Sequence, residues 1–212
     1  MVDLSRRIVF CAVPCRLSVS SRGAFGCGLS ALFIWAGLLA SGGLEMRAQP
    51  SASKEYQLKA AFLYNFAQFV QWPEAAFPEA STPISIGVLG DDPFGVALDR
   101  VVQGESINNR KLIIKRSRQL DDLQSCHLLF ISKSEKGRLA QILASLEARS
   151  ILTVGETEQF AKRGGVINFF FDENRIRFEI NTDAARRKGL KISSQLLSLG
   201  RIVGAETGPK NE

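Results

Sequence analysis

The sequence predicts an α/β fold, a single three-layer domain whose mostly parallel sheet ends in a C-terminal antiparallel β-hairpin and a terminal helix. Four apolar runs of strand length alternate with helix-like or polar segments over residues 84–154. Such alternation is typical of parallel sheets built from crossover units. Residues 166–180 then read as two strands joined by a polar turn. The 212 residues are 45% hydrophobic and 23% charged, which excludes a disordered or collagen-like chain.

The N-terminus has the composition of an export signal. Four arginines precede an uncharged apolar run of 17 residues at 24–40, and small residues follow it, as in a secretory signal peptide. We expect residues 1–42 to be this signal, with cleavage between about residues 40 and 48 and a periplasmic product. An uncleaved anchor that tethers the protein to the membrane is the alternative, because the run is barely long enough to span a bilayer.

Three further segments complete the expected organisation. Residues 43–53 read as a small, polar linker, residues 54–203 as the α/β domain and residues 204–212 as a flexible tail. The net charge of +6 does not indicate nucleic-acid binding, because residues 1–48 hold five arginines and two acids and so carry half of the excess. A basic patch has to lie in the folded part to bind nucleic acid.

Residues 54–70 predict a helix that is apolar on both faces. The bulkier stripe should pack inward, and it consists of Leu58, Phe62, Phe66 and Phe69. The opposite face would then dock a partner protein or a second copy of the chain, and its candidates are Leu63, Tyr64 and Val70, with Trp72 just after the helix. The alternative is that another element covers this second face and the whole helix belongs to the core.

The four expected strands are Ile84–Leu89, Leu112–Lys115, His127–Ile131 and Ile151–Val154. Helix starts follow three of them. Asp92-Pro93 predicts an N-cap with proline at the first helical position, Ser132 to Glu135 forms a capping box for a helix reaching about Arg149, and Thr157 can cap a short helix towards Lys162.

The last third of the chain predicts the hairpin and the final helix. In the second hairpin strand, Ile176, Phe178 and Ile180 should face inward, with Arg177 and Glu179 outward. Asn181 to Asp183 should then cap a helix that continues to about Leu199.

No motif for catalysis, metal or cofactor binding stands out. The sequence has no nucleophile elbow, zinc-protease helix, phosphate loop or dinucleotide fingerprint. His127 and Cys126 read as core residues of a buried strand. Cys126 is the single cysteine of the expected mature chain, so an internal disulfide is excluded. We therefore expect a protein that is not an enzyme, with no cofactor and no metal. Asp91 and Asp92 are paired acids of the kind that bind a divalent ion, but the role of Asp92 as an N-cap already accounts for it.

One site follows from position alone. Ligands of open parallel sheets bind at the carboxyl ends of the strands, near the point where the strand order reverses. The polar residues at these ends are Asp91, Ser117, Ser132, Ser134 and Glu156, and they are the candidates for a small-molecule crevice. Equally open is the interpretation that each of them caps a helix or closes a turn.

Several segments resemble the YfiR-like family of periplasmic proteins. They are KAAFLYNFAQFVQWP (59–73), GVLGDDPFG (87–95), CHLLFIS (126–132), ILTVGE (151–156) and GGVINFFFDENRIRFEINTDAARRKGLKISSQLL (164–197). The resemblance covers roughly residues 54–203 and implies a Rossmann-like domain, exported and without enzymatic activity. It further implies a partner, the periplasmic portion of an inner-membrane diguanylate cyclase or a sensor kinase. Repression of such a cyclase lowers cyclic di-GMP and disfavours biofilm.

The chain departs from the family in its cysteines. Family members can pair a first-strand cysteine with the one that aligns with Cys126, whereas this sequence has Gly87 there, and a second family disulfide also lacks its cysteines. The alternative function is a periplasmic small-molecule-binding module that works with a sensor kinase or a transporter.

Overall fold

The computed structural model describes residues 52–173 and 175–204. The expected export signal at 1–42, residues 43–51 of the expected linker and the tail from residue 205 lie outside the described residues. Within the described ranges, no helix is both long and apolar enough to cross a membrane.

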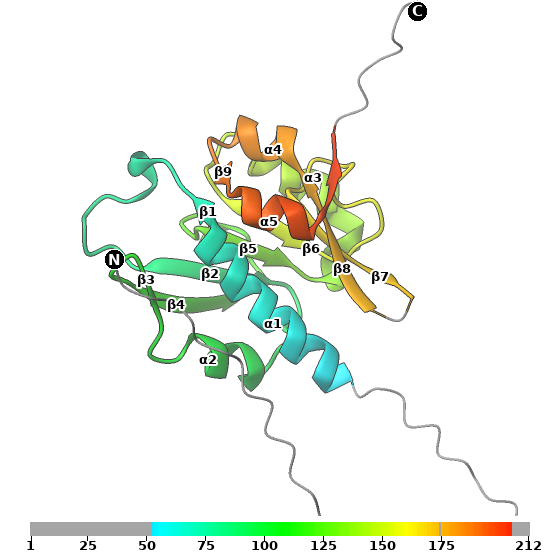
Figure 1. The fold of residues 1–212 in the computed structure, drawn as a ribbon, viewed down its shortest axis with the longest axis horizontal. Coiled ribbons are helices and arrows are strands. Elements are labelled where there is room, and N and C mark those ends of the chain that lie inside the picture. Colours follow the sequence, from blue (N-terminus) through cyan, green and yellow to red (C-terminus); the bar gives the residue numbers. More distant parts are fainter. Residues whose placement is uncertain (1–51, 174, 205–212) are drawn as a thin grey trace, which may run out of the picture. The chain divides into compact units, whose positions relative to one another are not determined.

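A mixed sheet of eight strands forms the centre of the domain, in the order β10–β8–β7–β6–β5–β2–β4–β3 (Figure 1). Neighbouring strands are parallel except at the β7–β8 and β3–β4 pairs. The strands are β2 (Ile84–Leu89), β3 (Ser106–Ile107), β4 (Arg110–Ser117), β5 (Leu128–Ile131), β6 (Leu152–Gly155), β7 (Ile167–Asp172), β8 (Arg175–Asn181) and β10 (Arg201–Val203). The mostly parallel sheet and the C-terminal hairpin are therefore confirmed.

Helices cover both faces of this sheet, which gives the three layers. One face carries α1 (Ala52–Phe69), α2 (Val96–Val102) and α5 (Ser194–Leu199), and Figure 1 shows α1 and α5 side by side in front of the strands. The other face carries η2 (Asp121–Leu123), η3 (Lys133–Arg138) and α3 (Leu139–Ser145). Each face of the sheet has its own hydrophobic core, and strand β5 contributes side chains to both. Leu128 and Phe130 pack on the α1 side, whereas Leu129 and Ile131 pack on the α3 side.

The expected terminal helix is in fact two short helices separated by a strand. Helix α4 (Thr182–Arg187) begins at the N-cap Asn181, whose side chain accepts a hydrogen bond from the Ala184 backbone N–H at 2.8 Å. It ends because Gly189 adopts φ +69°, and the Leu190 and Gly189 N–H groups return to the carbonyls of Ala185 and Arg186, as in a Schellman motif. Strand β9 (Lys191–Ile192) then pairs with β1 (Val70–Gln71) before α5.

Three other predicted helices also differ from the structure. Asp92 accepts a hydrogen bond from the Phe94 N–H at 2.8 Å in a tight turn, so α2 begins at Val96. The capping box at Ser132 opens the short 3-10 helix η3 and not a continuous helix to Arg149. Residues 157–162 form turns. A further short 3-10 helix, η1 (Glu74–Ala76), follows Pro73.

Candidate functional site

Ser134 and Glu135 pack against the end of β2 at the expected crevice. Strand β2 has β4 on one side and β5 on the other, all three parallel, so the order of strands reverses here and this is the switch point of the sheet. Ser134 Oγ accepts a hydrogen bond from the Asp91 N–H at 3.0 Å. Gly90 has φ +90°, and a Cβ at this glycine would lie 2.3 Å from Ser134 Oγ and 2.8 Å from the Glu135 carboxylate. The Ser134 and Glu135 side chains therefore lie directly against the backbone at Gly90.

Four of the five predicted crevice residues have local structural partners. Asp91 forms an exposed ion pair with Arg118 at 2.7 Å, and Ser117 Oγ donates to Asp122 at 2.6 Å. Ser132 is buried, and its Oγ accepts from the Ser134 N–H at the start of η3. The structure therefore favours capping and turn roles for Asp91, Ser117, Ser132 and Ser134.

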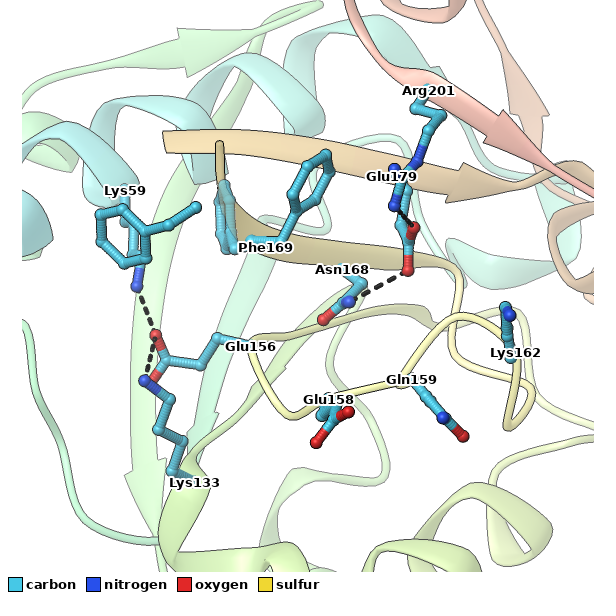
Figure 2. Close-up of a pocket in the computed structure, with 12 residues that line it drawn as sticks. Lys59, Lys133, Glu156, Glu158, Gln159, Lys162, Asn168, Phe169, Glu179 and Arg201 are labelled. Carbon is cyan, nitrogen blue, oxygen red and sulfur yellow. Dashed lines mark hydrogen bonds and ion pairs between the residues drawn. The ribbon is translucent and has the colours of Figure 1, made fainter. Parts of the chain in front are cut away.

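The fifth residue, Glu156, lies in an open pocket of about 420 Å³ next to the switch point. Figure 2 shows its carboxylate at one end of the pocket, and Glu179 at the other. The lining comes from α1, η3, the segment after β6, and strands β7, β8 and β10. The lining residues are Lys59, Lys133, Glu156, Glu158, Gln159, Lys162, Asn168, Phe169, Phe170, Phe171, Glu179 and Arg201.

A buried charge cluster forms the α1 end of the pocket. The Lys59 ammonium is almost fully buried and pairs with both Glu55 and Glu156. Tyr56 donates its hydroxyl to Glu156 at 3.0 Å, and burial, with the charge of Glu156, raises the pKa of this phenol. Lys133 lies 3.8 Å from the same carboxylate, from the solvent side. These contacts compensate the buried charges and fix α1 to the end of β6.

A second polar group spans β7, β8 and β10 at the other end. Asn168 donates to Glu179 at 3.1 Å, and Arg201 donates to the other Glu179 oxygen at 2.6 Å while its guanidinium lies 4.4 Å from the Phe170 ring centroid. Glu179, predicted to face outward, is therefore buried. The reason is that β10 pairs with β8 and brings Arg201 opposite Glu179. The Asn168 Oδ1 atom is buried and has no hydrogen-bond partner among the described residues.

The prediction that one face of α1 docks a partner is partly wrong. Leu63 and Val70 are buried in the core, because α2 and α5 pack against this helix in addition to the sheet. Tyr64 is half-buried and donates to Glu105 at 3.1 Å, and the Trp72 indole donates to the His127 carbonyl at 3.0 Å. Leu58, expected to point inward, is among the exposed large apolar side chains.

His127 and Cys126 are core residues, as predicted. The His127 Nδ1 atom accepts from the Ser85 N–H at 3.1 Å and its Nε2 atom lies 3.1 Å from the Ala76 carbonyl, so the neutral ring is satisfied on both sides. Burial raises the pKa of the Cys126 thiol, which favours its protonated form.

Most pocket residues were missed at the sequence level. Lys59 had a signal, since a cation in the middle of a helix that is apolar all round needs a buried partner. Asn168 and Glu179 had none, because their meeting depends on the register of β7 against β8. The lining contains no histidine, cysteine or serine, and its buried carboxylates are engaged by cations and hydrogen bonds. This arrangement suits binding better than group transfer.

The structure defines the chain as an α/β domain with an open pocket whose volume is in the range of small-molecule sites. The chain belongs to the YfiR/HmsC-like family, whose sequence pattern matches residues 56–201. This family is periplasmic, regulatory and non-catalytic.

Two solved structures are similar to the chain. One is a conserved domain protein from Vibrio cholerae O1 biovar El Tor, with 13% identity and a TM-score of 0.47, covering 69% of this chain and 59% of the other. The second is the ABC domain, in complex with L-Trp, from Streptococcus pneumoniae, with 10% identity and a TM-score of 0.44, covering 68% and 62%. The chain thus spans less than two thirds of either protein.

Proposed function

We propose that the protein is exported to the periplasm and represses an inner-membrane sensor protein, most directly a diguanylate cyclase, by binding its periplasmic portion. Repression lowers cyclic di-GMP and so opposes biofilm formation. The observation that carries the proposal is the family match over residues 56–201. A sensor kinase is the alternative partner, and the protein acts in either case without catalysis of its own.

The proposed partner surface is the β10 edge of the sheet. Strand β10 pairs only with β8 within the described residues, so its outer edge has backbone groups free to pair with another chain. Leu199 and Ile202 flank this edge and are 67% and 56% exposed. Exposed apolar side chains beside an unpaired strand edge suit a protein partner, or a second copy in a homodimer.

Charge substitutions at this edge test the proposal. Leu199→Glu and Ile202→Glu should leave folding unchanged, because both side chains already contact water, and should abolish repression of cyclic di-GMP. Val96→Glu is the matched control, since Val96 is equally exposed but lies on α2. Cyclic di-GMP is measured in a deletion strain complemented with each variant, alongside its periplasmic level. Full repression by both edge variants would place the interface elsewhere.

A second candidate function is a periplasmic small-molecule-binding module that works with a sensor kinase or a transporter. The pocket between Glu156 and Glu179 favours it, because a cavity of about 420 Å³ is within the usual range for small ligands. The two functions are compatible if the solute modulates binding of the partner.

A further inference from the structure

The pocket contains an acceptor that needs a donor from outside the protein. Asn168 is 4% exposed, and its Oδ1 atom has no partner among the described residues while its Nδ2 group is fixed on Glu179. Figure 2 shows this oxygen turned away from Glu179 and towards the Glu156 side of the pocket. An unsatisfied buried acceptor destabilises the folded protein. A hydroxyl or an N–H group of a ligand would satisfy it.

The charges around this acceptor are balanced. Lys59 is compensated by Glu55 and Glu156, and Arg201 by Glu179. The rim adds two exposed cations, Lys133 and Lys162, and one exposed acid, Glu158. The Lys133 ammonium lies 3.8 Å from the Glu156 carboxylate. A net anion or cation would meet no large opposite charge inside. A neutral ligand would keep these ion pairs intact, and its polar groups could both accept from the lysines and donate to Glu158.

Three aromatic side chains of β7 line the pocket from both sides of the strand. Phe169 and Phe171 lie on the α1 side, near Lys59, and Phe170 lies on the side of Asn168. Phe169 is buried, whereas Phe171 is exposed at the mouth although it is a large apolar side chain. An exposed ring at the mouth of a polar pocket offers a flat surface on which the apolar face of a ligand can stack.

From these three observations we infer that the pocket binds a neutral, hydroxyl-rich ring compound of the saccharide class. A hydroxyl group both donates and accepts, so one can donate to Asn168 Oδ1 while others meet Lys133, Lys162 and Glu158 at the rim. The C–H face of the ring then lies against Phe171. This inference rests on the second candidate function and names its ligand class.

Titration of the isotope-labelled protein, isolated as the cell produces it, tests the inference by NMR. The probes are glucose and N-acetylglucosamine, with glycine as a zwitterion and tetramethylammonium as a cation. We expect saturable shifts of amide resonances in residues 156–162 and β7 with at least one sugar. Phe171→Ala and Asn168→Leu should each weaken this binding by about tenfold, which corresponds to ~1.4 kcal/mol. Val96→Ala, on α2, should leave it unchanged.

Three results would overturn the inference. They are the absence of saturable binding by either sugar, sugar binding that neither pocket variant weakens, and a preference for glycine or tetramethylammonium. Should Asn168→Leu fail to fold, Phe171→Ala decides, since its side chain is exposed. Binding of another solute would support the second candidate function but contradict the saccharide class. Binding of none of the probes would contradict both proposals. Repression of cyclic di-GMP is measured without added sugar, so its outcome is independent.

Discussion

At the scale of single residues, His127 shows how burial sets the chemistry of a side chain. It is the one histidine of the chain, and it stacks on Phe77 at 4.5 Å between ring centroids. Burial lowers the pKa of this imidazole below its ordinary value of 6.5. The fold therefore stabilises the neutral ring, whose two nitrogen atoms meet the Ser85 N–H and the Ala76 carbonyl.

This lowered pKa predicts a pH-dependent stability. As the pH falls, the unfolded state takes up the proton first, so the stabilisation from His127 is complete above about pH 6.5 and is lost as the pH falls through the folded-state pKa. His127→Gln should reduce the loss of unfolding free energy between pH values of about 7.5 and about 5.5. Urea unfolding of both proteins at the two pH values measures it. Equal losses would mean that the imidazole does not titrate differently on unfolding.

Gly87 and Cys126 give a second prediction at this scale. A Cβ placed on Gly87 would lie 3.0 Å from Cys126 Sγ and 3.4 Å from its Cβ, close to the spacing of a disulfide. Gly87→Cys should therefore form a bridge to Cys126 under oxidising conditions, although the Leu129 methyl at 2.8 Å must shift. Stabilisation by about 2–4 kcal/mol is expected. Thiol titration and melting with and without reductant report it, and two free thiols after oxidation would exclude the pairing.

At the scale of elements, helix α1 was predictable from its sequence pattern, whereas the burial of its faces depends on tertiary packing. Its helical spacing of apolar residues predicted the element to within two residues. Which face is covered depends on α2 and α5, which lie far away in the sequence, so no local pattern could assign Leu63 to the core. Local patterns also failed at α4 and α5. The helical spacing of apolar residues continues past Gly189, whereas the chain turns there and begins a second helix.

Paired charge substitutions on α1 test this assignment. Leu63→Glu puts an uncompensated carboxylate at a site with 0% exposure and should destabilise the domain by about 4 kcal/mol or more. Leu58→Glu changes a side chain that is 48% exposed and should alter stability by about 0.5 kcal/mol or less. Denaturant unfolding measures both. A folded and stable Leu63→Glu protein would show that this face of α1 is exposed and not part of the core.

At the scale of the whole molecule, the fold class was predictable and the site was only partly so. The four strands from Ile84 to Val154 were found because they are short, apolar and separated by polar segments. The pocket was not found, because it needs β8 and β10 to meet in parallel and Arg201 to reach Glu179 across that pairing. Of the five residues predicted at the strand ends, Glu156 alone lines this pocket, because it follows the end of β6.

The level of cyclic di-GMP in living cells tests the proposed repression most directly. Deletion of the gene should raise it, and the full chain should restore the original level. A version without residues 1–45 should fail to restore it although it contains the whole domain, because repression requires the periplasmic side of the membrane. An unchanged level after deletion, or full restoration by the version without residues 1–45, would contradict the proposal.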